Sequence, residues 1–199
     1  MILSALGAAF IFADLIIFPF GRIFDAIPDL IGYLIILRWY SAASEVCRDR
    51  RLLRTLYSGA AFSILVSAAL LAVPAGHGGF YTAAYAVLFY ADCALTLLVG
   101  HRLTLCFVRL ELLCGIDLQT AFLKRAFLLA ALAHASAFPL AVFGLHFVAI
   151  AADLVPGAYF AFVLFTSAKI YRRAERLQSE LAAAEGDEQA NKKGPRGDL

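Results

Sequence analysis

Residues 55–91 read TLYSGAAFSILVSAALLAVPAGHGGFYTAAYAVLFYA and contain no Asp, Glu, Lys or Arg. One helix crosses the hydrocarbon core of a membrane with about 20 predominantly apolar residues. The stretch has 37 residues, which is enough for two such helices. The breaker cluster Pro74-Ala-Gly-His-Gly-Gly79 divides it near the middle. We therefore expect membrane-spanning helices near 54–74 and 80–101.

The composition of the whole chain indicates the same class of protein. Of its 199 residues, 62% are hydrophobic and 16% are charged, and the mean hydropathy is +0.81. Soluble domains carry about 25% charged residues and about 45–50% apolar ones. We therefore expect the apolar side chains on the surface of this protein to contact a lipid bilayer. The composition argues against a nucleic-acid-binding protein, a secreted disulfide scaffold and an ordinary cytosolic enzyme.

Four more spans follow from the remaining gaps between charges. Residues 126–168 carry Asp153 as their one charged side chain. We predict an all-α bundle of six transmembrane helices in residues 1–172, with the other four helices near 2–20, 28–47, 120–140 and 146–172. Residues 102–116 either lie along the inner membrane surface or prolong the fourth helix. Residues 173–199 are expected to form a charged cytoplasmic tail that begins as a helix and becomes disordered from Gly186.

The distribution of basic residues predicts the orientation. Segments 47–54, 101–125 and 169–199 carry 4, 4 and 7 Lys and Arg residues, whereas the alternate loops near 20–28, 75–80 and 140–147 carry 1, 0 and 0. Lys and Arg favour the cytoplasmic side of a membrane. Both termini are therefore expected to be cytoplasmic.

The start of the second helix carries a motif, Asp25-Ala-Ile-Pro28-Asp29-Leu-Ile-Gly32-Tyr33. It resembles the Asp-x-x-Pro-Asp-[Phe/Leu]-Ile-Gly-Tyr stretch of an uncharacterised family of small multi-spanning bacterial membrane proteins. The resemblance implies the bacterial inner membrane and no particular activity. From the residues themselves, the motif is either a capped helix start with a glycine at which another helix packs, or an outward-facing recognition site.

Four charged residues are predicted at depth in the membrane. At about 1.5 Å per residue, Asp14 lies about 18 Å into the first helix and Arg38 about 15 Å from the outer end of the second. Asp92 and Asp153 lie within the fourth and sixth helices. Because each charge costs about 2.5–3.5 kcal/mol at a helix centre, we expect these side chains to face the bundle interior, pair or become neutral. Arg38 either pairs with Asp14, binds an anionic or polar solute, or reaches to the inner surface.

The fourth helix carries polar side chains on one face. Tyr81, Tyr85 and Asp92 are four and seven residues apart, which places them on the same side. They form either a polar path into the membrane or a row of hydrogen bonds between helices.

The helix near 54–74 has small residues at four-residue spacing, which predict tight packing on a neighbouring helix. These residues are Gly59, Ser63 and Ser67.

The last two helices carry further polar groups. His134 in the fifth helix is either a hydrogen-bonding core residue or a proton relay. In the sixth helix, His146 and Asp153 share a face but lie about 10 Å apart along the axis, too far for direct contact. Pro156-Gly157 directly below Asp153 predicts a kink or an unwound turn.

No cofactor or metal site is predicted. The cysteines have no Cys-x-x-Cys spacing, and none is placed in an outer loop where a disulfide would form. They are Cys47, Cys93, Cys106 and Cys114.

Three functions are compatible with the predicted bundle. The first is a small-solute transporter or a membrane-embedded solute-binding subunit that uses the buried charges. The second is an accessory or regulatory protein that binds another membrane protein through the inner loop and the tail. The third is an intramembrane enzyme acting on lipid, in which Asp92 and Asp153 share acid and base roles. No nucleophile motif or metal-ligand motif supports the enzyme.

Overall fold

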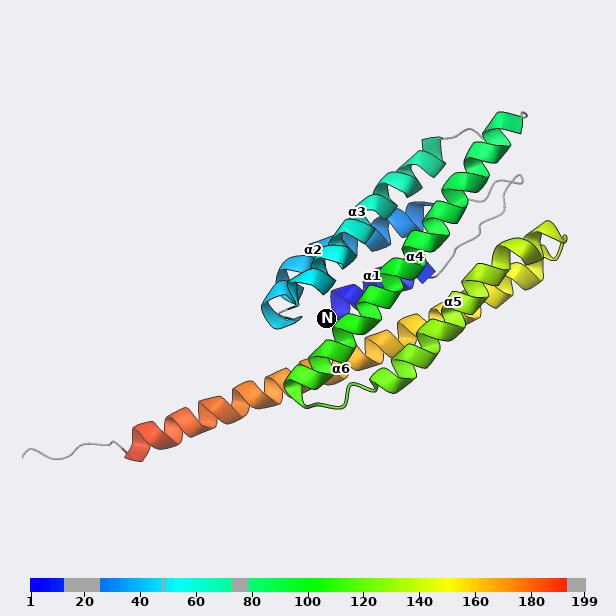
Figure 1. The fold of residues 1–199 in the computed structure, drawn as a ribbon. Helices are drawn as coiled ribbons and strands as arrows, with labels where there is room; N and C mark the ends of the chain where they lie inside the picture. Colours follow the sequence, from blue (N-terminus) through cyan, green and yellow to red (C-terminus); the bar gives the residue numbers. More distant parts are fainter. Residues whose placement is uncertain (13–25, 48, 73–78, 193–199) are drawn as a thin grey trace, which may run out of the picture.

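The computed structural model describes residues 1–12, 26–47, 49–72 and 79–192, and this part of the chain is all-helical (Figure 1). Its six helices are α1 (Ile2–Phe12), α2 (Ala26–Cys47), α3 (Arg50–Ala72), α4 (Gly79–Cys114), α5 (Thr120–Val142) and α6 (His146–Lys192). Three segments among the described residues are long and apolar enough to cross a membrane, namely Arg50–Leu70, Ala86–Cys114 and Ala151–Glu180. The chain is therefore a helical membrane protein.

α4 follows one of the two alternatives left open by the sequence, and α6 is longer than expected. Residues 102–114 prolong α4 without interruption, and α4 ends at Gly115, whose φ of 65° is left-handed. α6 runs through Pro156 and on to Lys192. Residues 186–192 are therefore helical where we expected disorder, because Ala, Glu and Gln favour helix and no proline occurs between Pro156 and Pro195. The predicted unwound turn at Pro156 is also not seen, since a transmembrane helix tolerates the loss of one backbone hydrogen bond.

α1 lies between α2 and α6 and packs closely on both (Figure 1). A Cβ atom placed on Gly32 of α2 would lie 2.7 Å from the backbone oxygen of Gly7 in α1. A Cβ atom on Gly157 of α6 would lie only 2.2 Å from the backbone oxygen of Phe12. Small residues allow helix backbones to approach this closely. Gly32 of the motif therefore serves helix packing.

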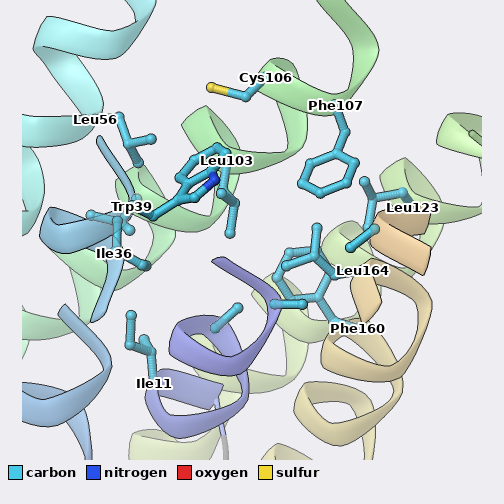
Figure 2. Close-up of a cluster of buried hydrophobic side chains, with 14 of the residues drawn as sticks. Ile11, Ile36, Trp39, Leu56, Leu103, Cys106, Phe107, Leu123, Phe160 and Leu164 are labelled. Carbon is cyan, nitrogen blue, oxygen red and sulfur yellow. The ribbon is translucent and has the colours of Figure 1, made fainter. Parts of the chain in front are cut away.

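Apolar side chains from all six helices form one core, part of which is drawn in Figure 2. Ile36 and Trp39 of α2 lie on one side of it, and Phe160 and Leu164 of α6 lie on the other. The Phe160 ring makes edge contacts with Phe12 and Phe127, at centroid distances of 5.0 and 5.5 Å. This core fixes the relative positions of the helices that carry the polar residues described below.

Two acidic residues cap the N-terminal ends of α3 and α5. The Asp49 side chain accepts hydrogen bonds from the backbone N–H groups of Arg51 and Leu52, at 3.2 and 3.1 Å. Glu111, near the end of α4, accepts from the N–H of Leu118 at 2.8 Å and from the hydroxyl of Thr120 at 2.7 Å. Glu111 of α4 thus binds the start of α5. The backbone N–H groups at the starts of α3 and α5 therefore have hydrogen-bond partners.

Candidate functional site

Six polar side chains from three neighbouring helices meet inside the bundle, and we call them the polar cluster. Each helix contributes two residues that are four positions apart: Asp29 and Tyr33 from α2, Ser63 and Ser67 from α3, and Asp92 and Thr96 from α4. Asp92 is half-buried and the other five residues are buried. The members of each pair lie one above the other on one helix face. The polar cluster therefore has two layers, each with one residue from each helix.

The carboxyl layer consists of Asp29, Ser67 and Asp92. The Ser67 hydroxyl donates a hydrogen bond to Asp92 Oδ1 at 3.1 Å. The side chains of Asp92 and Asp29 also lie close enough to interact with each other.

The hydroxyl layer consists of Tyr33, Ser63 and Thr96. The hydroxyls of Tyr33 and Thr96 are 2.6 Å apart, and the Ser63 side chain lies close to the Tyr33 hydroxyl. The Ser63 hydroxyl donates in addition to the backbone oxygen of Gly59 at 3.0 Å. The phenol of Tyr33 thus contacts residues of α3 and α4, one helical turn away from the two carboxyl groups.

A second polar contact joins the last two helices. His134 Nδ1 of α5 lies 3.0 and 3.2 Å from the two carboxylate oxygens of Asp153 in α6. The side chains are 11% and 8% exposed, so the pair is largely buried. His134 is also close enough to Asp92 to act on it electrostatically. The His134–Asp153 pair therefore lies within electrostatic range of the polar cluster.

The sequence-predicted site residues separate into groups. Asp29, Tyr33, Asp92, His134 and Asp153 are brought together in the way just described. Asp14 and Asp25 lie outside the described residues, and so does the proposed contact of Asp14 with Arg38. Pro28, Tyr81 and Tyr85 belong to α2 and α4, but their side chains also lie outside the described part.

Arg38 is exposed on the surface of α2 and does not face the bundle interior. The contacts of Asp29 with Asp92 and of Tyr33 with Thr96 show that α2 and α4 run in the same direction with a fixed offset. Continuing that offset places Arg38 level with about His101. Arg38 thus lies near the end of α2 where the other basic residues gather, and its exposure is compatible with a charged side chain that reaches the membrane surface.

Thr96 was not predicted as a site residue, and Ser63 and Ser67 were predicted only to pack against a neighbouring helix. A signal was present in the sequence, because each of three consecutive apolar helices carries a polar pair at four-residue spacing. The pairing of His134 with Asp153 carried no such signal, since it depends on how α5 lies against α6.

The polar cluster does not have the composition of a metal centre. Among the described residues, no group of three His, Cys, Asp or Glu side chains is placed to hold a metal ion. The groups it offers are two carboxyls, one phenol and three aliphatic hydroxyls, with an imidazole nearby. Such groups can accept hydrogen bonds, balance a positive charge and exchange a proton. Comparison with protein families, curated proteins and solved structures finds no match for this chain.

Proposed function

We propose that this protein is a six-span membrane protein that binds a small polar solute inside its bundle, as a transporter or as the solute-binding subunit of one. The bacterial inner membrane is the proposed location, from the resemblance of the Asp25–Tyr33 motif. Both termini are proposed to be cytoplasmic, from the distribution of basic residues.

The observation that carries the proposal is the polar cluster. Ionisable side chains inside a membrane are expensive and mark solute or proton pathways more often than other positions do. The carboxyl groups of Asp29 and Asp92 lie close enough to interact, and Asp153 is buried beside His134. Hydrogen bonds that only join helices need hydroxyls and amides, and the hydroxyl layer alone would supply them. The carboxyl layer is the part of the polar cluster that this structural role leaves unexplained.

The chemistry of the polar cluster favours one class of solute. Its described groups are rich in acceptor oxygens, and its acids carry negative charge when ionised. The basic Arg38, which the sequence analysis offered for an anionic solute, lies exposed on the bundle surface. The proposed solute is therefore a small molecule or ion that brings positive charge or hydrogen-bond donors.

Mass spectrometry of the protein purified in mild detergent tests the proposal by asking what leaves with it. We expect a stoichiometric small molecule that is lost in Asp92→Asn, since this change removes the charge and keeps the size of the side chain. Asp117→Asn is the matched control, because Asp117 is exposed in the α4–α5 connection and an amide oxygen can still accept from Gln119 N–H. Equal retention in both variants, or no small molecule in the wild type, would count against a binding function.

A second candidate, an accessory protein that binds another membrane protein, is favoured by the far end of α6. Beyond the bundle this helix continues as a projecting rod (Figure 1), and its residues from Arg172 to Glu180 are almost all exposed and rich in charge. In the same mass spectrometry experiment, this candidate predicts a stoichiometric partner protein. The partner would be retained in Asp92→Asn and lost when residues 173–199 are deleted.

A further inference from the structure

Basic side chains of four helices lie at nearly the same level in the bundle, and we call them the basic belt. Arg38 is level with about His101, as shown above. α3 runs antiparallel to α4, with Asp49 paired to Arg109 at 3.7 Å and Ser67 bonded to Asp92, so that Arg54 lies within about one turn of Arg102. The His101 ring contacts Phe127 of α5 at a centroid distance of 5.8 Å, so that Lys124 and Arg125 lie within about one turn of the same level. The basic belt comprises Arg38, Arg54, His101, Arg102, Lys124 and Arg125.

Arg102 differs from the other members of the basic belt in its surroundings. The other five side chains are exposed, whereas Arg102 is half-buried. Its Nε atom is buried and has no hydrogen-bond acceptor among the described residues. A guanidinium is always charged, and each of its N–H groups seeks an acceptor. The Arg102 guanidinium therefore needs an anionic acceptor that the described part of the chain does not supply.

The level of Arg102 identifies where such an anion is found. Lys and Arg gather at the inner boundary of a membrane, where anionic lipids give the surface a negative potential. The basic belt marks that boundary in this bundle. A lipid phosphate would therefore lie at the same depth as the Arg102 side chain, and arginine binds phosphate oxygens through paired N–H groups.

Apolar surface continues from Arg102 toward the middle of the membrane. Leu98, one turn away on α4, is 38% exposed. It packs beside Gly59 of α3, where an added Cβ would lie 3.6 Å from Leu98 Cδ2. Phe62 and Leu65, further along α3, are 62% and 64% exposed. An acyl chain whose headgroup sits at Arg102 would thus lie along exposed apolar side chains of α3 and α4.

We propose that Arg102 anchors the phosphate of one bound anionic phospholipid, whose acyl chain lies beside Leu98 on the surface between α3 and α4. The positive charge of Arg54 nearby favours an anionic lipid over a zwitterionic one. The inference is independent of the proposed solute site, which lies deeper in the bundle.

The test is native mass spectrometry of the full chain after exchange into detergent containing either phosphatidylglycerol or phosphatidylcholine. We expect one phosphatidylglycerol to be retained preferentially. Arg102→Gln should retain it about tenfold to hundredfold more weakly, because a hydrogen bond to a charged group is lost. Arg102→Lys, which keeps the charge, should retain it to an intermediate degree and also controls for folding. Arg173→Gln, an exposed position on α6, is the matched control and should bind as the wild type does.

Three results would overturn the assignment. One is equal retention of phosphatidylglycerol by the wild type and a folded Arg102→Gln variant. Another is equal retention of phosphatidylcholine by the wild type. The third is displacement of the lipid by millimolar inorganic phosphate, which would make Arg102 a site for a free anion.

Discussion

Replacement of Gly32 by alanine is expected to destabilise the contact between α1 and α2. The added Cβ would lie 2.7 Å from the Gly7 backbone oxygen and 2.6 Å from Cγ1 of Ile11. Overpacking costs about 1–3 kcal/mol, and the upper half of that range applies because one of the atoms is a backbone oxygen that cannot rotate away. Alanine regains about 1 kcal/mol of helix propensity over glycine. The expected net loss is about 1–2 kcal/mol, or about a 5- to 30-fold fall in the ratio of folded to unfolded protein.

The chain contains a single tryptophan, Trp39, which is 3% exposed in the core, so its fluorescence reports unfolding in a detergent titration. Gly59→Ala is the matched control. Its Cβ would make ordinary contacts, 3.4 Å from Val99 Cγ2 and 3.6 Å from Leu98 Cδ2. We expect this variant to be unchanged or stabilised by up to about 1 kcal/mol. Equal stability of Gly32→Ala and the wild type, or an equal loss in Gly59→Ala, would refute the assigned role of the close contact.

Three further predictions follow from the described contacts. Tyr33→Phe should lower the free energy of unfolding by about 1–3 kcal/mol, because it leaves the buried Thr96 hydroxyl without its partner at 2.6 Å. Tyr159→Phe, at an exposed position, should have no effect. Equal stability of the two variants would contradict the reasoning. Glu111→Ala should weaken the start of α5 by about 0.5–2 kcal/mol, seen as faster hydrogen exchange in the first turn of α5, and unchanged exchange would argue against its capping role. In right-side-out spheroplasts, a variant with Cys114 as its only cysteine should react with an impermeant maleimide only after permeabilisation, and labelling from outside would reverse the proposed orientation.

The helices could be predicted from the sequence because charge gaps and breaker clusters are local properties of the chain. The break at Pro74–Gly79 separates α3 from α4, and the small residues of α3 do face α4, as the contact of Ser67 with Asp92 shows. The extent of α4 was left open, because residues 102–114 are equally suited to a surface helix. In the structure α4 continues without a break to Cys114, and Glu111 near its end accepts a hydrogen bond from Leu118 N–H.

Depth in the membrane was harder to predict than position in the chain. Arg38 was placed near the middle of the membrane by counting from the start of its own helix. The structure instead aligns it with about His101, because the contact of Tyr33 with Thr96 sets how far α2 is shifted along α4. Such offsets arise from packing between helices and are not encoded in either helix alone. The same is true of His134 and Asp153, which belong to different helices.

The position of α1 has a consequence for biosynthesis. Phe12 packs against Gly157 and Phe160 of α6, although α1 leaves the ribosome well before α6 does. At about 5–20 residues per second, the intervening stretch takes about 7–30 s to translate. Throughout this interval, the side of α1 that will receive α6 must be covered by lipid or by the insertion machinery. A nascent chain released before α6 would retain the α1–α2 hairpin with this side exposed, and quality-control proteases of the membrane would have an incomplete bundle to recognise.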